Sequence, residues 1–254
     1  MSRLRILGCA GGVGGGRHTT CFLLNDDTLI DAGSGLCTLE LAQLQIIDQV
    51  VLTHSHLDHV LGIPLLLDAV ASTRTSPLII YGLPQTLSTL KQHFFNGHIW
   101  PTVAELGSAD QPIVMFKEVN VGDTILSGAV TVLPAAHAIP ACGYAIAGSK
   151  GTLVFTGDTR CGAAFWQAVN RLPNLTHLII ETSYMNEDGA LAQQAHHLTA
   201  NDLAVELGNL QQNPNILITH LKPGVEGEIM FQIGQAIGTA REVRALIQGS
   251  EVIF

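Results

Sequence analysis

The chain has 254 residues, of which 47% are hydrophobic and 13% are charged. This length and composition favour one large α/β domain with a substantial buried core, and they exclude long disordered stretches. The 12 basic residues are outnumbered by 21 acidic ones, which gives a net charge of −9, and no long basic run occurs, so the sequence lacks a surface that grips a long polyanion.

Short apolar runs rich in Val, Ile and Leu alternate along the chain with longer segments of helical period. The predicted strands, in chain order, span residues 4–9, 20–24, 28–31, 49–53, 78–81, 131–134, 144–147, 152–156, 177–181 and 216–219. The predicted helices span residues 36–46, 63–71, 85–94, 165–171, 199–211 and 225–238. These are more strands than a single parallel sheet needs, which indicates two sheets between helices. Because no repeat or linker divides the sequence, we expect one domain over residues 1–254.

Side chains suited to metal binding or acid–base chemistry follow the predicted strands at the points where they end. They are Asp31, the segment 53–59, His137, Asp158, Glu181 and His220. In α/β proteins the loops that leave the carboxyl ends of strands carry the ligand sites. We therefore expect these side chains to meet at one edge of the fold.

The segment 54–59, with the sequence HSHLDH, offers ligands for two metal ions. The alternate spacing of His54 and His56 lets both imidazoles point the same way from an extended loop. Asp58 and His59 stand in the first helical turn, where they face a neighbouring position. One loop cannot complete two sites, so further ligands must come from elsewhere in the chain.

Three distant strand ends are predicted to supply the remaining ligands, namely His137, Asp158 and His220. Asp158 follows Gly157, which allows a sharp backbone turn, and we expect its carboxylate to bridge the two ions. Imidazole and carboxylate ligands suit zinc, and also manganese or iron. We therefore predict a cofactor of two divalent metal ions, with zinc favoured.

Two further groups are predicted to act on the substrate. Glu181 and His197 could form an acid–base pair in which the carboxylate fixes the imidazole and His197 protonates the leaving oxygen; alternatively, His197 merely lies beside a helix start capped by Thr199. Lys222 is placed to bind a phosphate oxygen or else faces solvent. A serine nucleophile is not expected, because GxSxG does not occur and Ser183 has no evident base beside it.

The motif HxHxDH at 54–59 resembles the signature of the metallo-β-lactamase superfamily. That resemblance implies an αββα four-layer sandwich. Two divalent ions are expected to hold a bridging hydroxide that attacks the substrate, and Asp58 is predicted to be among the catalytic residues. The resemblance also implies that Asp31, in LIDAGSG, orients the metal-binding loop through hydrogen bonds. It assigns His54, His56 and His137 to the first metal and Asp58, His59 and His220 to the second. Asp158 is shared by both metals.

Later segments resemble the class II 3′,5′-cyclic nucleotide phosphodiesterases. The matching stretches are THSHLDHVLGIPLL from residue 53, HFFNGHIWP at 93–101, IETSY at 180–184, HLTA at 197–200 and ITHLKP at 218–223. The resemblance implies hydrolysis of cyclic AMP or cyclic GMP to the 5′-monophosphate, and it places Asn96 and Trp100 near the substrate. Ala200 stands where this family usually has proline, a change expected to affect the rigidity of the helix start more than the chemistry.

Two alternatives to this function remain open. The first is a ribonuclease Z-like tRNA 3′-processing endonuclease, which shares the metal ligands and an acidic residue paired with histidine. The second is a metal-binding interaction protein of the same fold without activity. The acidic composition favours a small cyclic nucleotide as the partner over an extended nucleic acid. A homodimer is left open.

The cysteines and the apolar runs bear on the compartment. Five cysteines without CxxC spacing argue against disulfides and a thiolate zinc site, so they are predicted to be reduced core thiols: Cys9, Cys21, Cys37, Cys142 and Cys161. The first residues lack the apolar core of a secretory signal, and the apolar runs are shorter than a membrane span. The sequence therefore predicts a cytoplasmic protein without membrane contact.

Overall fold

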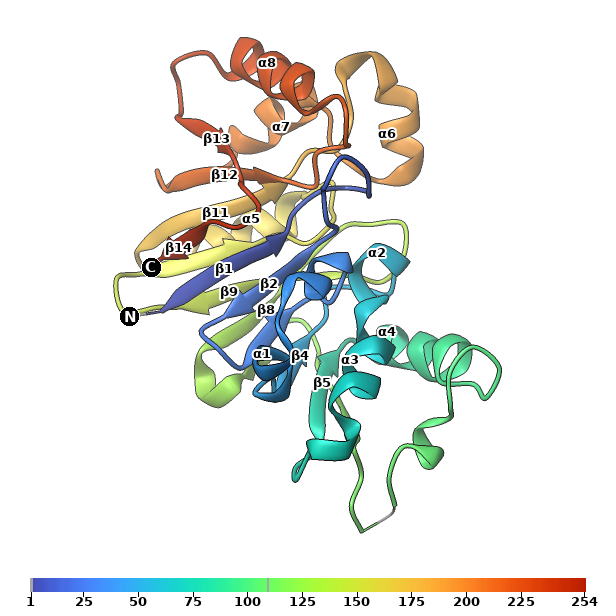
Figure 1. Cartoon of the computed structure of the whole chain (residues 1–254). Coiled ribbons are helices and arrows are strands. Elements are labelled where there is room, and N and C mark those ends of the chain that lie inside the picture. The colour runs from blue at the N-terminus through green and yellow to red at the C-terminus, as the bar shows by residue number, and fades with distance from the viewer. Residues whose placement is uncertain (1, 109) are drawn as a thin grey trace.

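Two seven-stranded sheets pack face to face in the computed structural model, which describes residues 2–108 and 110–254 (Figure 1). The first sheet has the order β14 (Glu251–Ile253), β1 (Arg3–Gly8), β2 (Cys21–Leu24), β3 (Thr28–Ile30), β4 (Gln49–Val51), β5 (Leu78–Gly82) and β6 (Val114–Glu118). The second has the order β13 (Val243–Ala245), β12 (Asn215–Thr219), β11 (Leu175–Glu181), β10 (Thr152–Phe155), β9 (Cys142–Ala147), β8 (Val130–Pro134) and β7 (Thr124–Ile125).

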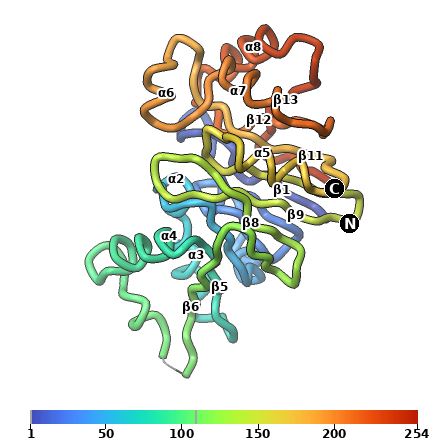
Figure 2. The backbone as a smooth tube through the Cα atoms, turned by 180° about the vertical axis from the view of Figure 1, so that it is seen from behind, coloured from blue at the N-terminus to red at the C-terminus, as the bar shows by residue number. Residues whose placement is uncertain are grey.

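Helices cover the outer face of each sheet. The first sheet is covered by α1 (Leu41–Gln45), α3 (Gly62–Val70) and α4 (Pro84–Thr89), and the second by α5 (Ala163–Asn170), α7 (Ala200–Leu207) and α8 (Glu226–Ile237). Seen from behind, the two helical layers lie on opposite sides of the strands (Figure 2). The αββα four-layer sandwich implied by the sequence is confirmed.

The inner core lies between the sheets and is built from both. Phe22 of β2 and Phe155 of β10 meet edge to face with ring centroids 4.9 Å apart, and both are almost fully buried. Burial of each such side chain contributes on the order of 1.5–3 kcal/mol. This contact ties the sheets together beneath the edge where the polar loops gather.

Each sheet changes from antiparallel to parallel pairing along its width. Strands β3, β4, β5 and β6 are parallel neighbours in the first sheet, and β10, β11, β12 and β13 are parallel neighbours in the second. Parallel neighbours end at the same edge, so the loops after β3, β4, β10, β11 and β12 emerge together. This arrangement positions the polar residues singled out in the sequence.

The strand β14 returns the chain to its beginning. It pairs antiparallel with β1, with Arg3 opposite Ile253, so the two ends of the chain lie side by side (Figures 1 and 2). The sequence did not predict β6, β7, β13 or β14. The first has only Val114 buried, and the other three are two or three residues long, so none offers a clear period-two pattern.

The helix predictions were correct in place but wrong in some bounds. The predicted helix 36–46 is two pieces, a 3₁₀ turn at Ser34–Thr38 followed by α1, because Glu40 forms a capping box with Gln43 and restarts the helix. The helix predicted at 85–94 is α4 followed by a π-helical turn, Leu90–Phe94. The helical turn expected at Asp58 and His59 is α2 (Leu57–Val60), and one short helix was missed, α6 (Gly189–Ala195).

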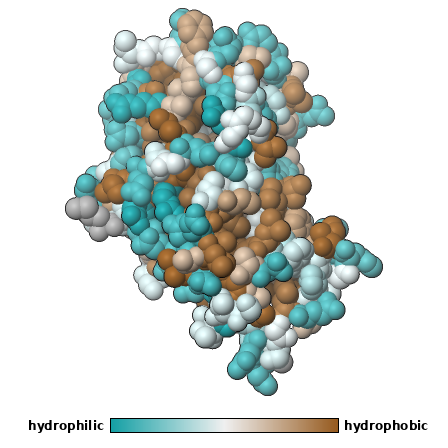
Figure 3. All heavy atoms as spheres, in the orientation of Figure 1, coloured by the Kyte–Doolittle hydropathy of each residue, from teal (hydrophilic) through white to brown (hydrophobic). Residues whose placement is uncertain are grey.

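The helices of the described chain are too short, or too polar, to cross a membrane. On the face seen in Figure 1, hydrophobic residues gather near the middle, beside a hydrophilic area (Figure 3).

Candidate metal centre

Asp31 organises the loop that carries most of the candidate metal ligands. It follows β3 in a left-handed conformation with φ of 55°, and its carboxylate is fully buried. Asp31 Oδ1 accepts from the backbone N–H of Thr53 at 2.8 Å, and Oδ2 accepts from the Thr53 hydroxyl at 2.8 Å. Asp31 Oδ2 also lies 2.8 Å from His59 Nδ1. One carboxylate thus fixes both the end of β4 and the ring of His59.

The first group of candidate ligands comes from three loops. His54 and His56 follow β4, His137 follows β8, and Asp158 follows β10 after Gly157, whose φ of 62° makes the turn that the sequence predicted. The ligand atoms of the three histidines and Asp158 all lie within 4.8 Å of one another. His56 Nδ1 is 3.1 Å from His137 Nε2, and His54 Nε2 is 3.6 Å from Asp158 Oδ2.

The second group of ligands consists of Asp58, His59 and His220. His220 Nε2 is 3.2 Å from Asp58 Oδ2, and His59 Nε2 is 3.8 Å from the same oxygen. Asp158 Oδ2 lies 3.3 Å from Nε2 of both His59 and His220. A single oxygen of Asp158 therefore reaches both groups, as a bridging ligand must.

Two buried ring nitrogens show that this cluster fits metal ions. Within the described residues, His54 Nε2 and His59 Nε2 are buried and have no hydrogen-bond partner. An unpaired polar atom inside a protein is costly, and a metal ion would satisfy both. Nitrogen and oxygen donors in two overlapping groups suit two divalent cations.

The electrostatics of the cluster favour ligand-competent protonation states. Burial lowers the pKa of His54 well below its usual value, and it lowers the pKa of His137 to about 4, so both imidazoles are neutral near pH 7. Burial opposes ionisation of Asp158, but the neighbouring His220 and His59 hold its pKa well below the usual range. These two histidines and Asp158 are therefore in the forms that bind metals. Burial also lowers the pKa of His59, but the charges of Asp158 and Asp31 outweigh it and raise that pKa well above its usual value, so His59 must lose a proton when it binds a metal.

Glu181 and His197 lie against the second ligand group. Glu181, the last residue of β11, is fully buried, and its Oε1 is 2.8 Å from His197 Nδ1. A ring nitrogen of His197 lies within 4.8 Å of the ligand atoms of Asp158 and His220. Since Nδ1 is occupied by Glu181, the nitrogen left to face the cluster is Nε2. Burial lowers the pKa of His197, but the charge of Glu181 outweighs it and raises the pKa.

Comparison with known proteins decides the family. Residues 27–221 match the model of the β-lactamase superfamily domain. The chain belongs to the β-lactamase superfamily. The match spans the loops that carry the first ligand group and extends beyond His220 of the second.

Individual relatives within this superfamily include phosphodiesterases and a ribonuclease. A probable 3′,5′-cyclic-nucleotide phosphodiesterase of Yersinia pestis is 26% identical over 221 residues, which cover 76% of this chain and 60% of the relative. Ribonuclease Z of Methanococcus maripaludis is 34% identical over 103 residues, which cover 39% of this chain and 30% of the relative. The chain thus spans less than two thirds of the length of these relatives.

The fold is also shared with solved structures. The crystal structure of unliganded yeast PDE1 superposes with a TM-score of 0.80 at 18% identity, covering 100% of this chain and 99% of that one. This similarity shows a common fold.

The residues predicted to bind substrate have partners of their own. Lys222 Nζ donates to the carbonyl of Gly11 at 2.7 Å and lies over the ring of Tyr184. Asn96 uses its amide within its own turn, where Oδ1 accepts from the backbone of His98 and Ile99 at 2.9 Å. Trp100 packs against the outer core of the first sheet. Their contact with a substrate stays a prediction.

Sequence reasoning missed several groups that hold the ligands. The statement that Ser183 has no base beside it is wrong, because its hydroxyl donates to Glu181 Oε2 at 3.1 Å and also lies 2.8 Å from His220 Nδ1. The carbonyl of His196 lies 3.1 Å from His137 Nδ1, and a backbone group leaves no trace in a sequence. Gly11 is required where it stands, since a Cβ there would come within 2.7 Å of His220 Nδ1.

The prediction of five core thiols is wrong for one residue. Cys21, Cys142 and Cys161 are buried and Cys9 is partly buried, but Cys37 is exposed. It lies in the 3₁₀ turn that interrupts the predicted helix, so its side chain leaves the core.

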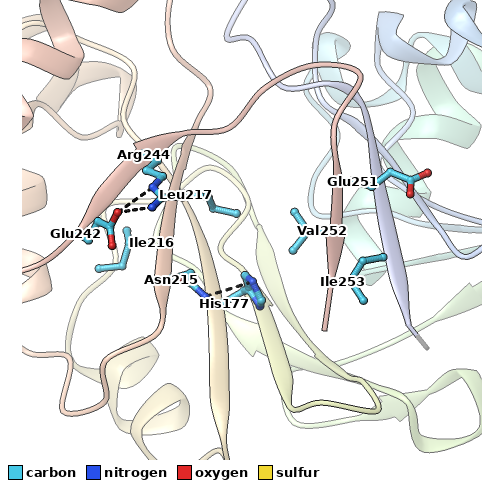
Figure 4. A pocket seen from close by; sticks show the side chains of 9 residues that line it. All are labelled: His177, Asn215, Ile216, Leu217, Glu242, Arg244, Glu251, Val252 and Ile253. Atoms are coloured by element: carbon cyan, nitrogen blue, oxygen red, sulfur yellow. Dashed lines mark hydrogen bonds and ion pairs between the residues drawn. The ribbon is translucent and has the colours of Figure 1, made fainter.

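A separate cavity lies away from the metal centre. It has a volume of about 290 Å³ and lies near the amino-terminal ends of β11 and β12, between them and β14 (Figure 4). Figure 4 shows its polar side chains, which include His177, Asn215, Glu242, Arg244 and Glu251. Among the described residues that line it, none belongs to the ligand groups. This cavity therefore does not contribute to the centre.

Proposed function

We propose that this protein is a metal-dependent phosphodiesterase that hydrolyses 3′,5′-cyclic nucleotides to 5′-monophosphates. The carrying observation is that Asp158 reaches two groups of ligands while the free Nε2 of His197 faces the same cluster. The similarity to the probable cyclic-nucleotide phosphodiesterase of Yersinia pestis, over 76% of this chain, supports the choice of substrate.

The ligand set supports zinc as the resident metal, with manganese and iron as alternatives. Imidazoles outnumber carboxylates among the ligands, and imidazole suits zinc better than the harder cations. When bound, a pair of divalent ions supplies a Lewis acid for the phosphate oxygens and activates water near neutral pH.

Side chains near the metal centre transfer the protons and bind the phosphate. His197 donates the proton on Nε2 to the 3′ oxygen as the bond from that oxygen to phosphorus breaks, while Glu181 keeps Nδ1 protonated. Asp58 is the more exposed ligand carboxylate, with 32% of its side chain accessible against 3% for Asp158, so it can accept the proton of the attacking water. Lys222, beside Tyr184, adds positive charge for the phosphate.

A second candidate is tRNA 3′-end processing, favoured by the partial similarity to ribonuclease Z of Methanococcus maripaludis. The metal chemistry would be the same. The net charge of −9 argues against it, because RNA binding depends on neutralising many phosphates.

A substrate panel separates the candidates. Purified protein, loaded in turn with zinc or manganese, is given 3′,5′-cyclic AMP, 3′,5′-cyclic GMP and a precursor tRNA, and products are resolved by chromatography. We expect 5′-monophosphates from a cyclic nucleotide, suppressed by a chelator and by Asp158→Asn. Cleavage of the precursor tRNA alone would transfer the assignment to the second candidate, and inertness toward all three would leave a non-catalytic binding protein.

A further inference from the structure

Ser183 occupies a junction between the acid–base pair and the metal ligands. It lies two residues beyond the end of β11, and its side chain is fully buried. Its Oγ is 2.8 Å from Nδ1 of His220, 3.1 Å from Oε2 of Glu181 and 3.3 Å from Nδ1 of His197. Three polar partners around one buried hydroxyl need a defined arrangement of protons.

The proton positions follow from the donors and acceptors available. His220 points Nε2 at Asp58 and Asp158, so this nitrogen must be unprotonated to bind a metal. The ring proton of neutral His220 is then on Nδ1, which donates to Ser183 Oγ. The serine hydroxyl donates in turn to Glu181 Oε2, a carboxylate oxygen that can only accept.

His197 completes the arrangement on the same carboxylate. Its Nδ1 lies 2.8 Å from Glu181 Oε1 and 3.3 Å from Ser183 Oγ, so the shorter and charge-assisted bond goes to Glu181. The two oxygens of Glu181 therefore serve different histidines. One holds the proton donor directly, and the other holds a metal ligand through the serine.

We propose that Ser183 is a positioning residue, whose hydroxyl connects the Glu181 carboxylate to the ring of His220. We call this chain of two hydrogen bonds the relay. The relay fixes the tautomer of His220 with Nε2 free for metal, just as the direct bond fixes His197 with Nε2 facing the substrate. The buried carboxylate of Glu181 then orients both a ligand of the second metal site, His220, and the proton donor, His197. This inference depends on the proposed metal centre and is independent of which phosphodiester is cut.

The surroundings leave the relay little freedom. Glu181 also accepts from the backbone N–H of Thr159 at 3.1 Å and of Leu198 at 3.4 Å, which anchors its carboxylate to two further loops. Gly11 closes the other side of the His220 ring, and His220 itself has a left-handed φ of 63°. A non-glycine residue is held in that conformation only when its neighbours determine it.

The test uses Ser183→Ala with a matched control. Thr182→Val removes a neighbouring hydroxyl that is equally buried, but that hydroxyl donates to the backbone carbonyl of Glu181 and contacts no histidine. Zinc affinity is measured for both variants by competition with a chromophoric chelator, and zinc content by elemental analysis. We expect Ser183→Ala to bind one ion as the wild type does and the other about 10–100-fold more weakly. Thr182→Val should match the wild type.

A second measurement determines the tautomer of His220 directly. In zinc-loaded wild-type protein labelled with ¹⁵N-histidine, His220 should show a protonated Nδ1 and a metal-bound Nε2, and Ser183→Thr, which keeps the hydroxyl, should preserve this pattern. A proton on Nε2 of His220, or unchanged affinity for both ions in Ser183→Ala, would overturn the relay alone. Wild-type protein that binds no divalent ion would overturn the metal centre, and the relay with it.

Discussion

Two buried carboxylates support the cluster from opposite sheets, and they do so differently. Asp31, after β3 of the first sheet, bonds directly to His59 and to Thr53, whose hydroxyl lies 3.0 Å from His54 Nδ1. Glu181, at the end of β11 in the second sheet, holds His197 directly and reaches a ligand only through a serine. The first carboxylate serves metal ligands alone, whereas the second serves a ligand and the proposed proton donor. The comparison suggests separable roles in metal retention and in proton transfer.

Loss of the shared ligand should have the largest effect. Asp158→Ala removes the oxygen that lies 3.3 Å from both His59 and His220, so neither group of ligands stays complete. We expect at most one bound ion per chain and turnover lower by at least about 10³-fold, since each metal contributes several kcal/mol. Elemental analysis and cyclic-nucleotide hydrolysis check the two parts. Full metal content in this variant would contradict the bridging role.

Loss of the proton donor should reduce turnover but spare the metals. His197→Ala is expected to lower kcat by about 10²–10⁴-fold, the usual contribution of general acid catalysis, with metal content unchanged. The control is His196→Ala, because the exposed His196 contributes only its carbonyl, to His137. Loss of a metal ion in the His197 variant would show that this imidazole is a ligand instead.

The pH profile should distinguish the two carboxylates. Glu181 raises the pKa of His197, so the acid stays protonated to higher pH, and activity falls as pH rises through that pKa. In Glu181→Gln the fall in kcat should begin at lower pH. Asp31→Asn should instead weaken zinc binding by about 10–100-fold and leave the alkaline limb of kcat in place once the protein is saturated with zinc. If the alkaline fall in kcat also moved to lower pH in Asp31→Asn, the two carboxylates would not have separate roles.

The smallest effect is expected away from both carboxylates. Burial raises the pKa of Cys9 to about 11 and that of Cys142 to about 12, which keeps these thiols unreactive near neutral pH. Cys37 is exposed. A thiol reagent should therefore label the native protein mainly at Cys37, as mass spectrometry would show, and Cys37→Ser should leave hydrolysis unchanged.

Local patterns predicted much of this molecule because the polar residues stand at strand ends. The ten predicted strands are all present, and their parallel pairing explains how the strand-end loops converge. The elements that the sequence did not predict depend on partners that are distant in the chain. The strand β14 pairs with β1 from the other end of the chain, and the short run EVI gives no local indication of it.

The supports of the site were predicted less well than its ligands, for the same reason. A serine such as Ser183 is common in any loop, and only the fold shows that its hydroxyl meets two histidines and a carboxylate. The carbonyl of His196 and the closeness of Gly11 to His220 are backbone properties with no residue-type pattern.

Metal stoichiometry of the purified wild-type protein tests the central claim most directly. Elemental analysis after incubation with zinc and removal of excess ion should find two ions per chain, and stepwise chelation should abolish cyclic-nucleotide hydrolysis, which returns on adding zinc. A protein that retains no divalent ion, or that hydrolyses its substrate equally well after complete chelation, would contradict a centre built on Asp158 and its histidines.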